Sequence, residues 1–126
     1  MGALLKKKKL IPDLIIASPA VRVKQTLELV TASCAYLGPI EWNESYYGAE
    51  PAEYVSGLKS VPASFQKVML VGHNPGMEGL LEQLIGKREK FPTAAIACLH
   101  LETDSWESLS LQTPAKLHHL WRPKEV

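Results

Sequence analysis

The sequence predicts an α/β fold with a mostly parallel sheet. Two short apolar runs, residues 14–17 and 67–72, indicate buried strands. Each run is followed by a turn and then by a segment whose apolar residues recur at helical spacing. Alternating strands and helices are typical of α/β domains. A chain of 126 residues with no linker and no internal repeat indicates a single domain, residues 1–126.

The first strand, residues 14–17, leads directly into the first long helix. Ser18-Pro19 provides a capping hydroxyl and a proline suited to a first helical position. The helix is expected to run to about Leu37 and to stop at Gly38-Pro39. A short strand is predicted at 40–42. The apolar stripe of the helix consists of Val23, Leu27, Val30 and Cys34.

The middle of the chain repeats this pattern. A second helix, opened by Pro51, is expected to end near Val61. Residues 67–72 form the clearest strand, residues 73–76 a turn, and Gly86 closes the helix that follows. The apolar face of that third helix consists of Met77, Leu80, Leu81, Leu84 and Ile85.

The last third of the chain changes character. Residues 95–101 and 106–111 are predicted as two strands joined by a hairpin at 102–105. Residues 116–121 are interpreted as one more strand.

Composition narrows the range of partners. A net charge of +1 offers no broad basic surface to nucleic acid or to an anionic membrane. No apolar run has the length of a membrane span, and the lysine run 6–9 is interpreted as a solvated helix end. Cys34 and Cys98 form no Cys-x-x-Cys pair and do not indicate a disulfide framework. We expect a cytoplasmic protein without membrane or nucleic-acid partners.

Two strand-to-helix junctions carry the residues suited to chemistry. Arg22 lies one turn into the helix after the first strand, and His73 directly follows the strand 67–72. In parallel sheets ligands bind beyond the carboxyl ends of the strands, and helix N-termini favour phosphate. A guanidinium engages two phosphate oxygens, and a histidine exchanges protons near neutral pH. Together these groups would form an oxyanion clamp for phosphoryl transfer.

The sequence around these residues resembles the histidine phosphatases, the phosphoglycerate mutase-like superfamily. Residues 18–26, Ser-Pro-Ala-Val-Arg-Val-Lys-Gln-Thr, are similar to the family's Ser-Pro-x-x-Arg-x-x-Gln-Thr segment, and residues 71–76, Val-Gly-His-Asn-Pro-Gly, to its second-histidine motif. Residues 91–95 and 121–124 resemble later motifs of the small SixA-like branch. The four matches occur in the family's order over nearly the whole chain.

The resemblance implies a fold and a mechanism. The fold is a three-layer histidine phosphatase fold with a mostly parallel central sheet. A histidine in an Arg-His-Gly segment after the family's first strand attacks phosphorus, and water hydrolyses the phosphohistidine. Arg22 takes the role of the second arginine and His73 that of the second histidine, and Asn74 is assigned with them to phosphate binding. The mechanism uses no metal and no other cofactor.

One part of the family pattern is missing. No Arg-His-Gly occurs in these 126 residues, and the other histidines, His100, His118 and His119, are interpreted as packing or surface residues. Residues 1–5, Met-Gly-Ala-Leu-Leu, resemble an internal segment of the family. We therefore expect an N-terminally truncated chain that lacks the first strand and the nucleophile. A truncated gene, a misassigned start codon and a shortened expression product each explain this.

Two functions follow from that expectation. The first is a SixA-like phosphatase whose full-length form is active, while the chain as given is inactive. The second is a non-catalytic pseudophosphatase that binds phosphate or phosphoproteins. Glu44, in the predicted loop 43–50, is a weak candidate for the general acid, and a surface carboxylate is the favoured interpretation. The substrate class is a phosphorylated protein or a small phosphomonoester.

Overall fold

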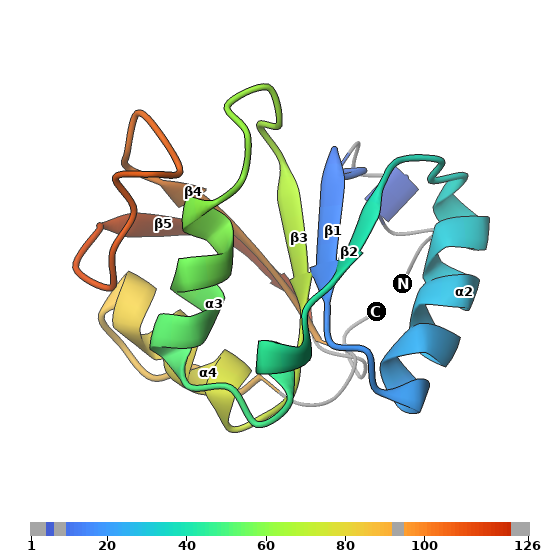
Figure 1. Cartoon of the computed structure of the whole chain (residues 1–126). Coiled ribbons are helices and arrows are strands. Elements are labelled where there is room, and N and C mark those ends of the chain that lie inside the picture. The colour runs from blue at the N-terminus through green and yellow to red at the C-terminus, as the bar shows by residue number, and fades with distance from the viewer. Residues whose placement is uncertain (1–4, 7–9, 92–94, 122–126) are drawn as a thin grey trace. The chain divides into compact units, whose positions relative to one another are not determined.

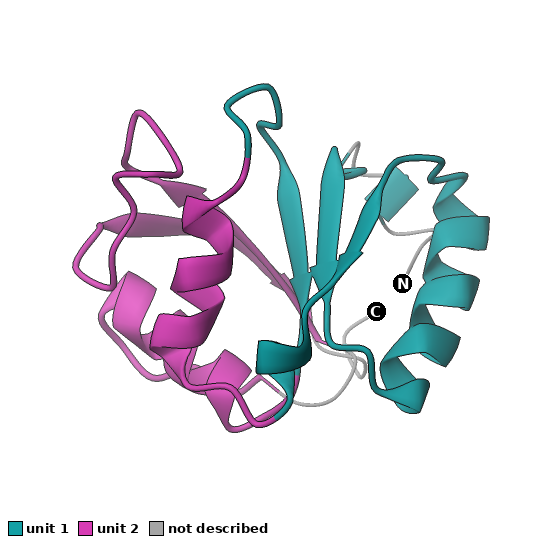
Figure 2. Cartoon of the chain, in the orientation of Figure 1, with its two compact units in different colours: residues 1–47, 62–72 teal, residues 48–61, 73–126 magenta. Residues whose placement is uncertain are grey.

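The computed structural model describes residues 5–6, 10–91 and 95–121, and it confirms the α/β class (Figure 1). The chain divides into two compact units, coloured separately in Figure 2. Unit 1 consists of residues 1–47 and 62–72, and unit 2 consists of residues 48–61 and 73–126.

Unit 1 is built on a three-stranded parallel sheet in the order β2-β1-β3 (Figure 1). The central strand β1 (Leu14–Ala17) pairs with β2 (Ile40–Trp42) on one side and with β3 (Val68–Val71) on the other. All four residues of β1 are buried, as the continuous apolar run predicts for a strand covered on both faces.

Helix α2 (Val21–Cys34) follows β1, and its buried residues are the predicted stripe of Val23, Leu27, Val30 and Cys34. Its predicted ends were wrong. The helix begins two residues after Pro19, because the Ser18 hydroxyl accepts the Ala20 N–H at 3.3 Å and holds a turn before the helix. It ends before Gly38, because Ala35 adopts a left-handed conformation with φ of 56°.

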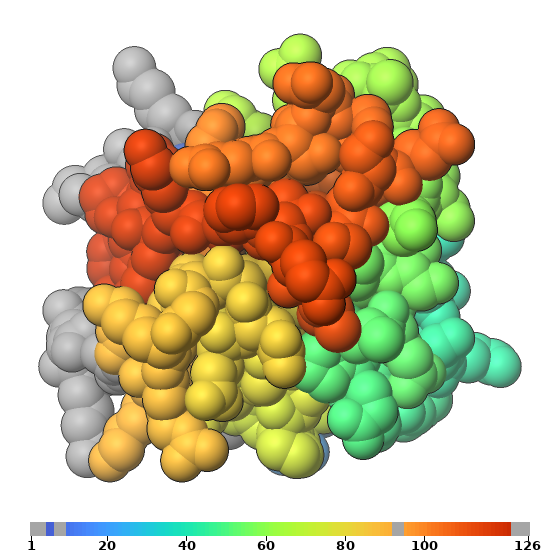
Figure 3. Space-filling model, turned by 90° about the vertical axis from the view of Figure 1, so that its left-hand side faces the viewer, coloured from blue at the N-terminus to red at the C-terminus, as the bar shows by residue number. Residues whose placement is uncertain are grey.

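Unit 2 contains helices α3 (Pro51–Lys59) and α4 (Gly76–Ile85). Helix α4 contacts both α3 and strand β5, and Figure 3 shows α4 in yellow below the orange and red strands. Gly86 terminates α4 in a left-handed conformation with φ of 76°, which confirms the predicted stop.

The strands of unit 2 differ from the prediction. Strand β4 (Ile96–Leu101) pairs antiparallel with β5 (Ala115–Trp121), so the predicted hairpin between 95–101 and 106–111 was wrong. Residues 106–111 form turns instead. Hydroxyl groups near these residues form local hydrogen bonds. The Ser105 hydroxyl donates to the Ser108 hydroxyl at 2.9 Å, and the Thr113 hydroxyl accepts the Ser110 N–H at 2.9 Å. Such side-chain bonds compete with a sheet ladder.

Cys34 and Cys98 are both free thiols. His100, His118 and His119 are exposed on β4 and β5, where the His119 ring stacks on Trp121 at 4.8 Å between centroids. In the described part of the chain, no helix combines the length and apolar character required to cross a bilayer.

Asp13 joins the start of β1 to the start of β3. Its carboxylate accepts the backbone N–H groups of Gln66 at 2.9 Å and Lys67 at 3.0 Å, and its own N–H donates to the Lys67 carbonyl at 2.7 Å. The two N–H donors hold the pKa of the Asp13 carboxyl below its ordinary value. The ionised form therefore stabilises the fold.

We predict that Asp13→Ala lowers the free energy of unfolding by at most about 1 kcal/mol at pH 7, because the side chain is exposed and solvent screens its hydrogen bonds. Because the folded pKa is lowered, this stabilisation is complete above the unfolded pKa of about 4 and disappears as the pH falls through the folded value. Urea unfolding of both proteins at pH 7 and at pH 3 measures the difference. Asp104→Ala, at an exposed turn, is the matched control. An equal loss in both variants would contradict the assignment.

Candidate functional site

The carboxyl ends of β1 and β3 lie side by side in unit 1. Ala17 is paired with Val71, and the Ser18 N–H donates to the Val71 carbonyl at 3.0 Å. Ser18 is fully buried, and the chain turns there from the sheet into α2. Arg22 is therefore the second residue of a helix that starts at this sheet edge, and it is exposed.

The end of β2 meets the same edge. The Asn43 N–H donates to the Ala17 carbonyl at 2.8 Å, and its side-chain Oδ1 accepts the Ser45 N–H at 2.9 Å. Asn43 thereby caps a short 3₁₀ helix, η1 (Glu44–Tyr46), whose first residue Glu44 is exposed. The Lys24 ammonium lies 5.5 Å from the centroid of the Trp42 ring, within cation–π range.

His73 is the first residue of unit 2 after β3 and is half-buried. Its N–H donates to the Tyr54 hydroxyl at 3.1 Å, and its carbonyl accepts the Met77 N–H at 3.0 Å. Burial raises the pKa of the Tyr54 phenol, so the hydroxyl keeps its proton at neutral pH. The His73 backbone is thus held between α3 and the first turn of α4.

Asn74 uses its side chain within unit 2. Its Nδ2 donates to the Phe91 carbonyl at 2.6 Å, and its Oδ1 accepts the Glu78 N–H at 3.1 Å. The Oδ1 contact satisfies one of the backbone donors that the start of α4 leaves open. The described role of Asn74 is to hold the turn, and its assignment to phosphate binding stays a prediction.

The start of α4 packs closely against Ala49 and Tyr54, which belong to the same unit. Gly76 is buried, and a Cβ at this position would collide with the Ala49 carbonyl oxygen and approach the Tyr54 ring to 3.1 Å. A glycine is required here because the neighbouring backbone occupies the place of a side chain.

The structure sorts the predicted site residues into two sets. Arg22 and Glu44 belong to unit 1, at the sheet edge where β1 and β2 end, and His73 and Asn74 belong to unit 2, at the start of α4. The strands that lead to Arg22 and His73 are neighbours in register. A clamp formed by the two side chains stays a prediction.

Sequence reasoning missed Tyr54 and Glu78. Tyr54 belongs to the buried face of α3, where an aromatic residue indicates packing and gives no sign of a hydroxyl contact. Glu78 was detectable in part, because an Asn that precedes a helix with an acidic residue in its first turn is typical of a capped N-terminus. The motifs predicted at 91–95 and 121–124 fall largely on residues 92–94 and 122–124, which lie outside the described residues.

Comparisons with known proteins identify similar structures. No family model matches the sequence, and no curated protein matches it. A protein assigned as phosphohistidine phosphatase SixA from Nakamurella multipartitia superimposes with a TM-score of 0.83 at 22% identity, covering 97% of this chain and 77% of that chain. One so assigned from Agrobacterium tumefaciens gives 0.77 at 29% identity, covering 97% and 75%. The protein histidine phosphatase SixA complexed with tungstate gives 0.81 at 21% identity, covering 98% and 76%.

We predict that Gly76→Ala lowers the free energy of unfolding by about 1–3 kcal/mol, the range for overpacking against a rigid neighbour. The matched control is Gly79→Ala, in the same helix, where a Cβ would meet only the Pro51 ring at 3.3 Å. That substitution should cost clearly less than Gly76→Ala, because the preference of alanine for a helix interior offsets the tight contact with the Pro51 ring. Thermal unfolding of both variants measures the contrast, and equal stability of the two would contradict the close approach at Gly76.

Proposed function

We propose that this chain, whose fold is similar to that of SixA histidine phosphatases, forms the phosphate-binding part of a phosphatase that acts through a phosphohistidine. The observation that carries the proposal is the parallel pairing of β1 with β3, which places the starts of both motifs at one sheet edge. The similarity to SixA structures over 97% of the chain or more supports it.

Arg22 and His73 have the chemistry for binding the phosphoryl group. Arg22 stands in the first turn of α2, where the free N–H groups and the helix dipole favour an anion. Its guanidinium contributes paired, charge-assisted hydrogen bonds to two phosphate oxygens. His73 precedes the first turn of α4 and contributes a further ring donor.

We infer that the nucleophile lies outside these 126 residues, because they contain no Arg-His-Gly. In the proposed reaction a histidine nitrogen bonds to phosphorus while the bond from phosphorus to the leaving group breaks. The leaving group departs with the bonding electrons and takes up a proton. Water then attacks phosphorus, releases inorganic phosphate and regenerates the imidazole. Arg22 and His73 would neutralise charge on the phosphoryl oxygens in both steps.

The proposed substrate is a phosphorylated protein or a small phosphomonoester. The names of the similar structures, phosphohistidine phosphatase and protein histidine phosphatase, favour phosphohistidine in a protein. The exposed Glu44 is available as a proton donor to a leaving group. Phosphohistidine has a good leaving group, so we expect only a small contribution from Glu44 with that substrate.

The chain as given should bind tungstate, the oxyanion held by one of the similar structures. We predict that Arg22→Ala weakens this binding at least about tenfold, the lower range for hydrogen bonds to a charged group. Isothermal titration calorimetry at low salt measures the affinity. The matched control is Arg88→Ala, which removes an exposed arginine paired with Glu82 and should change the affinity less than about twofold. Equal affinities of the wild type and Arg22→Ala would contradict the role of Arg22.

The chain as given should not hydrolyse an aryl phosphate above background. An N-terminal extension that carries a strand followed by Arg-His-Gly should give turnover and raise Tm. The gain in Tm is expected because β3 lies at the sheet edge in the described part of unit 1, where an added strand can pair. The same extension with Ala in place of its His should raise Tm equally and give no turnover.

The outcomes distinguish the two candidate functions. Turnover by the extended chain, with a trapped phosphohistidine, supports the phosphatase. Anion binding by an extended chain that folds well and hydrolyses nothing supports the pseudophosphatase. Turnover by the unextended chain that is abolished in His73→Ala would contradict the assignment of the nucleophile to a segment outside these residues.

A further inference from the structure

We propose that Glu78 is a positioning residue that holds the His73 turn by tethering the backbone of Phe91 to the first turn of α4. The inference rests on the proposed function only for its binding readout. Its geometry lies entirely within unit 2 and stands by itself.

The tether is a ring of three hydrogen bonds. The Phe91 N–H donates to Glu78 Oε2 at 3.2 Å, and the Phe91 carbonyl accepts Asn74 Nδ2 at 2.6 Å. The ring closes where the Glu78 N–H donates to Asn74 Oδ1 at 3.1 Å. Both polar groups of one backbone residue are therefore held by two side chains at the start of α4.

The ring acts directly on the residue before Asn74. His73 is held by Tyr54 on the α3 side and by the Met77 N–H within α4. The hydrogen bond from Asn74 to the Phe91 carbonyl restrains the turn from the other side. This bond persists only while the Phe91 backbone stays in position. Loss of the Glu78 bond would free the Phe91 N–H, loosen the Asn74 contact, and widen the range of positions open to His73.

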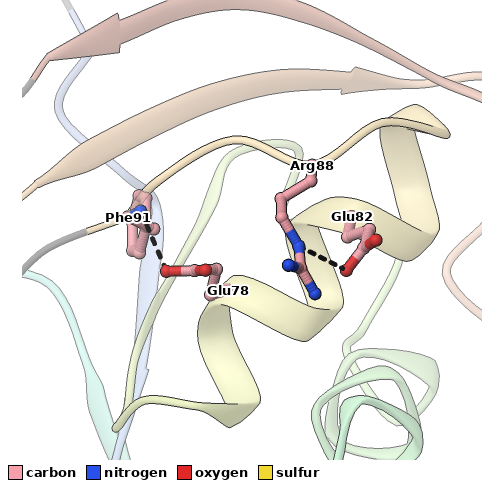
Figure 4. Close-up of polar contacts among 4 residues, drawn as sticks. All are labelled: Glu78, Glu82, Arg88 and Phe91. Atoms are coloured by element: carbon pink, nitrogen blue, oxygen red, sulfur yellow. Dashed lines mark hydrogen bonds and ion pairs between the residues drawn. The ribbon is translucent and has the colours of Figure 1, made fainter.

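A second interaction, between Arg88 and Glu82, joins α4 to the same loop but does not involve Asn74. Arg88 Nε lies 3.9 Å from Glu82 Oε2, one turn further along the helix, and Figure 4 shows both tethers. The Arg88 and Glu82 side chains are 78% and 46% exposed, so this pair is weak. Unlike Glu78, Glu82 makes no described bond to Asn74, so it serves as the internal control.

Two substitutions of Glu78 separate the effect of its negative charge from the effect of its side-chain length. Glu78→Gln removes the negative charge and keeps an oxygen that can accept the Phe91 N–H. Glu78→Asp keeps the charge in the first turn of the helix, where it is favourable, but shortens the side chain by one methylene. A positioning role predicts that Gln preserves function and Asp loses it, whereas a purely electrostatic role predicts the reverse. Neither substitution introduces a poor residue for a first helical turn.

The experiment compares the wild type with Glu78→Gln, Glu78→Asp and the matched controls Glu82→Gln and Glu82→Asp. Amide hydrogen exchange by NMR follows the Phe91 N–H, which is bonded to Glu78, and the Met77 N–H, which is bonded to the His73 carbonyl. Tungstate affinity is measured for the same five proteins. We expect Glu78→Asp to speed exchange at both amides about tenfold, the lower range for a lost hydrogen bond to a charged group. Tungstate binding should weaken less, by about fivefold, because Glu78 acts on His73 only through Asn74 and Phe91.

Glu78→Gln should stay within about twofold of the wild type in exchange and bind tungstate at least as tightly, since a negative charge is removed. Both Glu82 variants should exchange at the wild-type rate at Met77. Unchanged exchange in Glu78→Asp, or loss in Glu78→Gln equal to that in Glu78→Asp, would overturn the proposal. If the wild type binds no tungstate, the proposed function fails, and the exchange rates of Met77 and Phe91 still decide the positioning role.

Discussion

The pairing of β1 with β3 is the constraint on which the other features of unit 1 depend. Ala17 lies opposite Val71, and the Ser18 N–H continues the ladder to the Val71 carbonyl. Because a parallel sheet brings its strand ends to one edge, this register fixes where both motif-bearing segments begin. All four residues of β1 are buried, so this pairing lies in the core of unit 1.

Polar groups then define how the chain leaves the sheet. Asp13 holds the start of β3, and Asn43 holds the end of β2 beside Ala17. In unit 2, Tyr54, Asn74 and Glu78 bond to backbone groups around the His73 turn. Each of these side chains satisfies backbone donors or acceptors that no helix or strand would satisfy. The residues around the candidate site therefore serve first to fix backbone positions, and the side chains of Arg22 and His73 are presented by that framework.

Much of the fold could be predicted from local patterns. Strands 14–17 and 68–71 are short apolar runs, and the stripe of α2 follows from 3.6-residue spacing. The errors occurred where side chains form local hydrogen bonds, or where a residue other than glycine adopts a left-handed conformation. Ser18 shifted the start of α2, Ala35 ended it without a glycine, and serine and threonine contacts turned residues 106–111 away from a strand. Apolar periodicity carries no information about such bonds.

The sequence by itself determined the α/β class, the two motifs and the candidacy of Arg22, His73, Asn74 and Glu44, because residue type and spacing are local properties. Only the tertiary structure decided that β4 pairs with β5, and that the Tyr54 hydroxyl and the Glu78 carboxylate converge on the turn around His73 and on Phe91. The Tyr54 contact joins residues 19 positions apart, and the Glu78 contact joins residues 13 positions apart. No local pattern records which distant backbone group a side chain will meet, because packing of the whole unit selects that partner.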